Sequence, residues 1–341
     1  MRSPPTVLIL METTPAQLDR VRATGVAEVR VGPHLSESGK SIDKQLLQGA
    51  ECLLCELPPA NFDDLDHVKW IQLSSAGYSQ IFGLPLVERG IRVSNGRGNF
   101  DIPIAEWNIM MMLLWHRSLL EMAEHQRQRV WDRSARFQSE LRGAVVGFYG
   151  YGGLARETAR LARQMGLEVW ALTRDGRVKP RDGIYCVPGT GDPRGTLCHR
   201  VFCPDDKAEF LAGVDFLVLA RPITPATTSI LGETELRGLK PSAVLLNPAR
   251  AGLVEEQALI RCMREGWIRG ASIDVHYSYP LPPEHPLWSL PNVVLTPHIS
   301  GSNLSPHFQE RICEIFSQNL ERYCRGKPLL NELTPAQIQG K

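Results

Sequence analysis

The sequence has no excess of either charge and no hydrophobic run long enough to cross a membrane. Its 38 Lys and Arg residues balance 37 Asp and Glu residues, which gives a formal net charge of +1. A chain so close to neutral lacks the basic field that attracts nucleic acid or an anionic membrane. The longest apolar stretch, Asn108–Trp115, is flanked by Glu106, His116 and Arg117 and is far shorter than a membrane span. We therefore expect neither a nucleic-acid partner nor a membrane partner.

The amino-terminal sequence also lacks the pattern of an export signal. Met1–Pro5 leads directly into an apolar run at Thr6–Leu10, without a basic leader, a long apolar segment and a small-residue cleavage site in series. The 341 residues suffice for two domains of ordinary size, and 43% hydrophobic with 22% charged residues is typical of a globular protein. We therefore expect a cytoplasmic protein.

The cysteine pattern gives little support for metal or redox chemistry. Cys52 and Cys55 have a CxxC spacing, but they lie in an apolar run and no second pair stands at a zinc-like spacing. Thiols in such a run are usually small buried hydrophobes. Cys186, Cys198 and Cys203 fall in one irregular stretch, where a disulfide is the less favoured interpretation for a cytoplasmic chain. We predict no metal site.

Short apolar runs alternate with helical patterns along most of the chain, which predicts parallel sheets with crossover helices. A long helical pattern spans 104–131, and a final one spans 304–324. The later apolar runs match the six strands of a dinucleotide-binding sheet. The runs expected to be strands are Val7–Met11, Glu28–Val31, Cys52–Cys55, Trp70–Leu73 and Ile91–Ser94, and then Ala144–Tyr149, Glu168–Leu172, Phe216–Ala220, Ala243–Asn247, Gly270–Val275 and Asn292–Thr296.

The segment 174–207 interrupts this alternation. Its two parts at Arg174–Gly183 and Pro188–Gly195 are rich in Gly, Pro and charged residues, a composition typical of a loop. Loops of this length are uncommon unless they have a task. We predict a long loop here, without a role that the sequence can name.

A glycine-rich turn follows the run that ends at Tyr149. Gly150 and Gly152 allow the backbone to approach a pyrophosphate at a helix N-terminus, and Ala155 is small enough for close helix–strand packing. A strand before the turn and an Ala-rich helix after it are the context that this motif requires. The residues predicted to bind a dinucleotide here are Gly150, Tyr151, Gly152, Gly153 and Leu154.

The end of the next apolar run indicates which dinucleotide binds. An acidic residue normally holds the adenosine ribose hydroxyls at this place, but the sequence has Thr173 followed by Arg174. A hydroxyl and a guanidinium suit a 2′-phosphate, whereas a carboxylate would repel it. Three more basic residues follow closely, at Arg177, Lys179 and Arg181. The sequence thus favours NADP, with NAD as the alternative if these basic residues form only a solvated loop.

Three chemically active residue types stand at the ends of later apolar runs. Arg250 follows one run, Asp274 ends the next, and His298 follows Thr-Pro after the last. Ends of strands in an open α/β sheet are where reactive groups meet a ligand. A guanidinium can grip a carboxylate, and an imidazole that titrates near neutrality can give a proton to a developing alkoxide.

The sequence around these residues resembles the D-2-hydroxyacid dehydrogenases over about Leu53 to Asn331, with specific motifs. The resemblance implies a Rossmann nucleotide-binding domain at 104–298 and a discontinuous flavodoxin-like substrate domain at 1–103 and 299–341, both doubly wound α/β folds. It implies hydride transfer between NAD(P)H and a small 2-oxo or D-2-hydroxy acid in the cleft between the domains. Arg250 would bind the substrate carboxylate, and His298 would move the proton.

Further roles follow from the same resemblance. The backbone of the loop at Ser75, Ala76 and Gly77 would hold the substrate carboxylate, because small residues let it come close. Asp274 would contact the nicotinamide amide, and a segment containing Pro222 and Thr224 would line the adenosine side. The apolar helix Ile104–Trp115 would form a homodimer interface, although an intrachain core helix is the competing interpretation.

The chain departs from the family pattern at two positions. Ser79 stands where an Asp is usual, and Tyr279 replaces the Glu that usually pairs with the catalytic His. Three interpretations of Tyr279 stay open. Its hydroxyl orients His298 in a slower enzyme, the site serves another substrate, or turnover is lost and the protein is a nucleotide-binding regulator. Distantly related formate dehydrogenases also lack the Glu, but their substrate-binding Asn has no clear match here. If another carboxylate serves His298, Glu106 and Glu284 are the first candidates.

Overall fold

The computed structural model describes residues 4–37, 39–134, 136–302 and 305–340. They form two compact units, each described by itself below. Unit 1 contains Met1–Phe100, Asp182–Cys186 and Ser302–Lys341, and unit 2 contains Asp101–Arg181 and Val187–Gly301. The domain ranges that the resemblance implies, 104–298 and 1–103 with 299–341, do not include 182–186 in the first domain. The prediction that there is no export signal concerns the amino-terminal residues, of which Met1–Ser3 lie outside the described residues.

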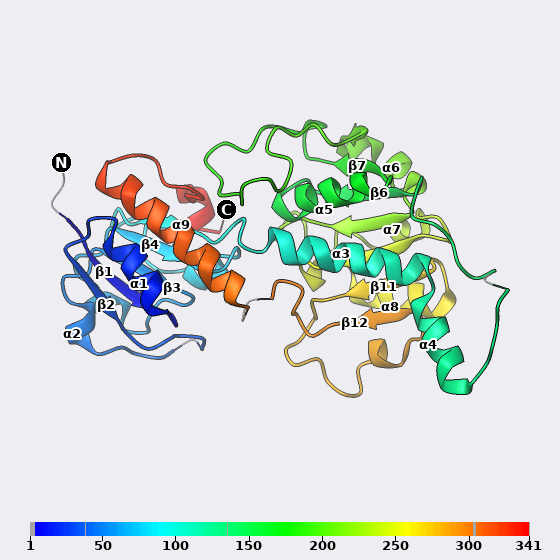
Figure 1. Cartoon of the computed structure of the whole chain (residues 1–341), viewed down its shortest axis with the longest axis horizontal. Coiled ribbons are helices and arrows are strands. Elements are labelled where there is room, and N and C mark those ends of the chain that lie inside the picture. Colours follow the sequence, from blue (N-terminus) through cyan, green and yellow to red (C-terminus); the bar gives the residue numbers. More distant parts are fainter. Residues whose placement is uncertain (1–3, 38, 135, 303–304, 341) are drawn as a thin grey trace. The chain divides into compact units, whose positions relative to one another are not determined.

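Unit 1 is built on a five-stranded parallel sheet with the order β2-β1-β3-β4-β5, which is the flavodoxin-like order. Its first helix, α1, lies alongside α9 (Figure 1). The predicted start of α9 at Leu304 lies outside the described residues. The elements are β1 (Thr6–Leu10), α1 (Pro15–Arg22), β2 (Glu28–Val31), α2 (Lys44–Leu47), β3 (Cys52–Cys55), β4 (Trp70–Leu73), β5 (Arg92–Ser94), α9 (Pro306–Cys324) and α10 (Pro335–Ile338).

Successive side chains of these strands face opposite sides of the sheet, and both sides are covered. Leu8, Leu53 and Ile71 belong to one core cluster. On the other side, the Trp70 ring lies 5.2 Å from the ring of Phe316 in α9. Strands buried on both faces explain why the sequence shows continuous apolar runs here rather than alternation.

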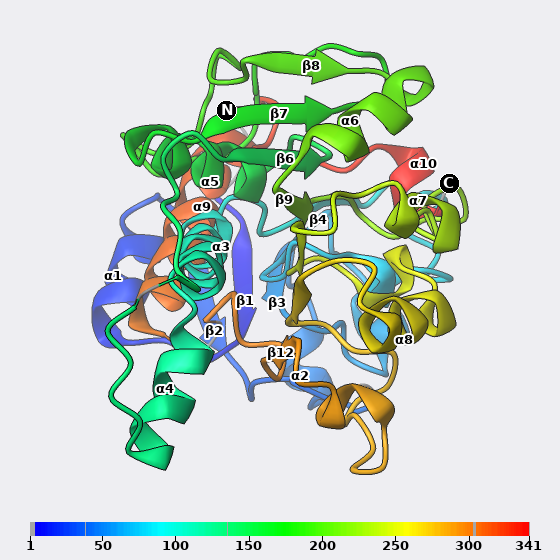
Figure 2. The same ribbon diagram turned by 90° about the vertical axis from the view of Figure 1, so that its right-hand side faces the viewer.

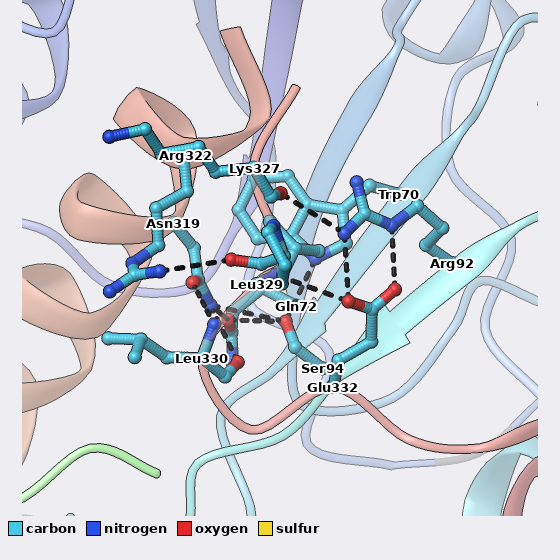
Figure 3. Close-up of polar contacts among 11 residues, drawn as sticks. Trp70, Gln72, Arg92, Ser94, Asn319, Arg322, Lys327, Leu329, Leu330 and Glu332 are labelled. Atoms are coloured by element: carbon cyan, nitrogen blue, oxygen red, sulfur yellow. Dashed lines mark hydrogen bonds and ion pairs between the residues drawn. The ribbon is translucent and has the colours of Figure 1, made fainter. Parts of the chain in front are cut away.

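Polar contacts fix α9 and the segment after it onto this sheet (Figure 3). The buried Asn319 amide donates to the Gln72 side chain at 2.9 Å, and its oxygen accepts the backbone N–H of Leu330 at 2.7 Å. Arg92 makes a two-pronged ion pair with Glu332 at 2.7 and 2.8 Å. The carboxyl-terminal segment is therefore an integral part of unit 1.

Unit 2 is built on a seven-stranded parallel sheet with the order β12-β11-β10-β9-β6-β7-β8 (Figure 2). The strand order reverses between β6 and β9, and the crevice at such a switch point is where α/β sheets bind ligands. The elements are α3 (Asp101–His116), α4 (Leu119–Gln128), β6 (Val145–Tyr149), α5 (Gly153–Gln164), β7 (Glu168–Leu172), β8 (Arg200–Phe202), α6 (Lys207–Gly213), β9 (Phe216–Leu219), α7 (Glu233–Arg237), β10 (Val244–Asn247), α8 (Glu256–Glu265), β11 (Gly270–Ile273) and β12 (Val293–Leu295).

The prediction of six strands and an irregular segment 174–207 was wrong at β8. This short strand pairs with β7 at the edge of the sheet, and Phe202 is buried with its ring 5.1 Å from that of Trp170. A three-residue strand has too little alternation to be recognised, and its partner β7 stabilises it only in the folded chain.

The prediction of one long helix over 104–131 was also wrong, because the helix is broken after His116. Ser118 adopts a left-handed φ of 49°, and its hydroxyl donates to the Phe137 carbonyl at 2.8 Å. Helix α4 then begins at Leu119. No helix in the described ranges combines the length and apolar character needed to cross a bilayer.

Buried side chains hold the connection between β7 and β8 on unit 2. Arg156 of α5 donates to the carbonyls of Lys179 at 2.6 Å and Tyr151 at 3.2 Å, and it also contacts the carbonyl of Asp192. The Tyr151 hydroxyl donates to the Asp192 carboxylate at 3.0 Å. The basic side of this segment is therefore fixed against the first turn of α5.

The middle of the same connection is part of unit 1. The Tyr185 hydroxyl donates to Glu314 of α9 at 2.7 Å, and its backbone N–H donates to the Asn331 side chain at 3.0 Å. The Asn331 N–H in turn donates to the Gly183 carbonyl at 2.8 Å. The long connection therefore has a structural task in both units.

Candidate functional site

The glycine turn joins the end of β6 to the start of α5. Gly150 has a φ of +95°, and a Cβ there would meet Arg221 at 2.6 Å and the Ala220 carbonyl at 2.8 Å. Gly152 is the residue before the helix, and a Cβ there would meet only the Ala220 carbonyl, at 4.0 Å. The turn therefore needs Gly150 for its own conformation, whereas Gly152 faces open space at a helix N-terminus. That space suits a pyrophosphate.

The other predicted residues of this turn contribute differently. The Tyr151 side chain is buried toward Asp192, so only its backbone faces the turn. Leu154 packs against the core on the α3 side. Gly153 begins α5, and a Cβ there would lie 2.0 Å from the Asp101 carboxylate. A dinucleotide at this turn could therefore meet these three residues only through their backbone.

Thr173 and Arg174 directly follow β7, where the sequence places the adenosine ribose. The Thr173 hydroxyl accepts the Arg177 N–H at 3.0 Å and keeps its own proton to donate. Arg174 is exposed and has no hydrogen bond or ion pair within the described residues. An exposed guanidinium beside a hydroxyl suits a 2′-phosphate.

The segment after β9 lies on the same edge of the sheet. Pro222 and Thr224 are exposed, and a hydrogen bond of 2.7 Å from the Thr224 N–H to the Thr227 hydroxyl shapes their turn. The Arg221 guanidinium lies 5.3 Å from the centre of the Tyr149 ring. An exposed turn beside the glycine turn is consistent with the predicted adenosine side.

The three residues at strand ends come together because their strands are neighbours. β10, β11 and β12 are adjacent and parallel, so their carboxyl ends share one edge. Arg250 is exposed just after β10. The Asn247 side chain fixes its turn by donating to the Arg250 carbonyl at 3.0 Å and accepting the Ala249 N–H at 3.1 Å.

Asp274 is fully buried and organises the turn that carries His298. Its carboxylate accepts the Thr296 hydroxyl at 2.6 Å, the Ile299 N–H at 2.9 Å and the Ser300 N–H at 3.0 Å, and it also accepts the Ser300 hydroxyl. Four donors fill the acceptor sites of a carboxylate. The geometry therefore makes Asp274 a positioning residue for the turn.

His298 has a left-handed backbone with a φ of 58°, which few non-glycine residues adopt. Its N–H donates to the Thr296 carbonyl at 3.0 Å. The same carbonyl accepts the ring Nε2–H of His276 at 2.9 Å. Such a conformation persists only where the surroundings hold it, and here Asp274 and His276 do so.

Tyr279 lies beside His298 but presents its ring rather than its hydroxyl. The two ring centres are 5.5 Å apart, and the Tyr279 hydroxyl accepts the His276 N–H at 3.2 Å. The side chain is 60% exposed. Tyr279 can therefore restrict the orientation of the imidazole, but it supplies no negative charge.

Partial burial of the imidazole lowers the pKa of His298 below its ordinary value, although the residue also reaches solvent. The Arg250 and His276 side chains lower this pKa further, while the Asp274 carboxylate opposes them. Glu106 and Glu284 are not among the described charges that shift it. Neither glutamate therefore replaces the missing partner.

In unit 1, the loop at Ser75, Ala76 and Gly77 follows the end of β4. Its carbonyls are turned into the protein. The Ser75 carbonyl accepts the Gly96 N–H at 2.8 Å, that of Ala76 accepts the Asn95 amide at 2.7 Å, and that of Gly77 accepts the Ser75 hydroxyl at 2.8 Å. Because the carbonyls of this loop are held on one side of its backbone, the N–H groups can point to the other side and bind an anion there.

His276 and Arg181 are not among the site residues predicted from the sequence. His276 is buried beside the predicted residues, and its Nδ1 has no partner within the described residues. Its place two residues after Asp274 was a usable signal. Arg181 pairs with Asp101 across 80 positions of sequence, a contact for which no local pattern exists.

Comparisons with known proteins agree with this geometry. The family model described as D-isomer specific 2-hydroxyacid dehydrogenase, NAD binding domain, matches residues 109–300. A glyoxylate reductase of Thermofilum pendens is 30% identical over 292 residues, which is 84% of this chain and 80% of the relative. A glycerate dehydrogenase of Methylorubrum extorquens is 28% identical over 293 residues, covering 83% and 85%.

A solved structure shows that the likeness extends to the whole fold. The NADPH-dependent glyoxylate/hydroxypyruvate reductase of Sinorhizobium meliloti, solved with NADP and sulfate, matches with a TM-score of 0.73 at 24% identity. The match covers 99% of this chain and 100% of that chain. The predicted pair of parallel α/β sheets is thereby confirmed.

Proposed function

The chain belongs to the D-isomer specific 2-hydroxyacid dehydrogenase family, and we propose that it reduces a small 2-oxo acid to a D-2-hydroxy acid with NADPH. The observation that carries this proposal is the shared strand edge where Arg250 stands near His298 on the turn organised by Asp274. One site there provides a carboxylate-binding cation and a proton donor.

The residues divide the reaction between them. The dinucleotide, when bound, supplies the hydride that reaches C2 of the substrate. Arg250 binds the substrate carboxylate through its forked donors. In unit 1, the N–H groups of Ser75, Ala76 and Gly77 are the backbone donors that suit an anion. Protonated His298 donates its proton to the oxygen on C2 as negative charge develops there.

The proposed preference for NADP rests on two features at the end of β7. Arg174 is exposed without an intramolecular partner in the described chain, and Thr173 offers a hydroxyl rather than a carboxylate. Only the 2′-phosphate of NADP would use both groups. NAD is the alternative cofactor, and the remaining dinucleotide-binding residues serve either one.

Tyr279 has the role, in this proposal, of positioning His298 through ring contact. Because Tyr279 brings no carboxylate to His298, there is a second candidate function. In that function the protein binds a nucleotide as a regulator and has no turnover. The lowered pKa of His298 favours that alternative, since it reduces the protonated fraction at neutral pH.

A substrate screen separates the two functions. Glyoxylate, hydroxypyruvate and phenylpyruvate are each supplied with NADPH or NADH, and oxidation of the dinucleotide is followed by absorbance. The reductase is supported if the wild-type protein turns over an acid and His298→Ala abolishes this turnover. The control is His67→Gln, at an exposed histidine of unit 1, which should preserve it. Tight dinucleotide binding without turnover of any acid would support the regulator.

We also propose that the protein is a homodimer through α3 and α4. Met110, Leu113, Leu119 and Leu120 are exposed there, and the first three of them line an apolar groove on unit 2. Figure 1 shows that α4 extends away from the sheet of that unit. A second copy of the same apolar face is the occupant that suits a surface with so few charges.

A further inference from the structure

We propose that Arg181 contacts the pyrophosphate of the bound dinucleotide and that Asp101 orients its guanidinium beside the glycine turn. This inference rests on the proposed dinucleotide function and adds a binding residue from the long connection between β7 and β8. It predicts an effect common to NADH and NADPH, because both contain the pyrophosphate.

The Arg181–Asp101 ion pair lies close to the glycine turn. The Arg181 Nη1 lies 3.1 Å from the Asp101 Oδ2. That carboxylate lies so close to Gly153 that a Cβ there would be 2.0 Å from it. Gly153 is the first residue of α5, next to the open space in front of Gly152. The Asp101 side chain therefore separates the guanidinium from the helix N-terminus where a pyrophosphate would lie.

This ion pair differs in burial from the other ion pair that the described residues form on the same connection. The Arg181 and Asp101 side chains are 13% and 15% exposed. Lys179 and Asp175, also on this connection, are 71% and 42% exposed. An exposed pair of that kind contributes little and is a solvated surface contact. Arg181 is instead held in a defined place.

The backbone around Arg181 is fixed to the same helix. Its N–H donates to the Pro193 carbonyl at 3.0 Å, and Arg156 of α5 donates to the Lys179 carbonyl at 2.6 Å. The segment that carries Arg181 is thus attached to the first turn of α5. A phosphate bound by that turn would meet the guanidinium without a change in the path of the chain.

The Arg181 guanidinium has hydrogen-bonding capacity left for a ligand. A guanidinium has five N–H donors, and within the described residues that of Arg181 makes one hydrogen bond, to Asp101. The remaining donors can bind phosphate oxygens in the bidentate geometry that arginine favours. Asp101 balances the cation in the free protein, but its own charge repels the arriving phosphates.

The test measures binding rather than turnover, by titration calorimetry with NADH, NADPH, ADP and adenosine. Arg181→Gln should weaken NADH, NADPH and ADP about ten- to hundredfold, the equivalent of one charge-assisted contact, and leave adenosine unchanged. Arg181→Lys, which keeps the ion pair but loses the fork, should give a smaller loss. Lys179→Gln is the matched control and should change no constant.

Asp101→Asn should change the affinity for the dinucleotides in the opposite direction. The amide oxygen can still accept from Arg181, while the charge that repels phosphate is removed, so NADH and NADPH should bind about three- to tenfold more tightly. An ion pair with only a structural role would make both the Asp101 and the Arg181 variants bind more weakly.

Each other outcome is decisive. If Arg181→Gln leaves the dissociation constants unchanged while the wild-type protein binds normally, the assignment of Arg181 is overturned but the proposed function is not. A loss confined to NADPH would also overturn it, because Arg181 would then serve the 2′-phosphate. Failure of the wild-type protein to bind either dinucleotide would overturn the proposed function and this assignment together.

Discussion

Replacing Tyr279 by Glu should move the pH dependence of 2-oxo acid reduction to higher pH. Reduction requires protonated His298, so its rate falls as pH rises through the pKa of that residue. Partial burial, Arg250 and His276 lower this pKa, which places the fall below about 6.5 in the wild-type protein. A carboxylate beside the ring stabilises the imidazolium and raises the pKa.

The size of the shift follows from the distance between the two side chains. The Tyr279 and His298 ring centres are 5.5 Å apart. Both residues reach solvent, so an effective dielectric constant of about 40 is appropriate, between the value near a protein surface and that of water. Two unit charges at this distance then interact by about 1.5 kcal/mol, which corresponds to about one pKa unit.

The assay is the pH profile of kcat for the best 2-oxo acid found in the screen. Tyr279→Gln is the matched control, because Gln has the shape of Glu without its charge. Tyr279→Phe removes the hydroxyl that accepts the His276 N–H and keeps the ring beside His298. We expect the descending limb to move to higher pH by about one pH unit in Tyr279→Glu and to stay at the same pH in both controls. A descending limb at the same pH in the Glu and Gln variants would contradict the predicted shift.

Three further predictions concern the cofactor, the assembly and the turn that carries His298. Arg174→Ala should weaken NADPH by about 1.5–3 kcal/mol in binding titrations and leave NADH nearly unchanged; equal losses would contradict the NADP assignment. Leu113→Glu should produce a monomer in sedimentation at micromolar concentration, whereas Val31→Glu, at an exposed apolar residue of unit 1, should not; a wild-type monomer would remove the dimer proposal. Asp274→Asn should lower the free energy of unfolding by about 2–4 kcal/mol in urea titrations, because an amide cannot accept every hydrogen bond that the carboxylate accepts. It should also lower the pKa of His298, since Asp274 raises it, and an unchanged kcat profile would show that Asp274 does not support the proton donor.

Several elements could be recognised from the sequence because their signal is local. The buried runs at Cys52–Cys55, Trp70–Leu73 and Glu168–Leu172 have the bounds that the sequence predicts. Strands of a parallel sheet covered on both faces must be apolar throughout, so such a run reveals the strand directly. The glycine turn was recognisable for a related reason, since only glycine accepts the φ of +95° at position 150.

The candidate site could be predicted in part because of sheet geometry. Arg250 and His298 follow strands in the sequence, and the carboxyl ends of neighbouring parallel strands meet at one edge of a sheet. The orientation of Tyr279 was not predictable, since it depends on the hydrogen bond between its hydroxyl and the His276 N–H. The engagement of Asp274 with the turn at Thr296–Ser300 was likewise visible only in the folded chain.

The positions of most buried strands, the glycine turn and the residue types at the strand ends follow from the amino-acid sequence alone, because hydrophobic pattern and backbone requirements act within a few residues. Four features depend on long-range contacts in the folded chain: the edge strand β8, the break at Ser118, the place of 182–186 in unit 1 and the pairing of Asp101 with Arg181. Each of these depends on a partner distant in sequence, and the free energy that stabilises such a contact appears only when folding brings the two segments together.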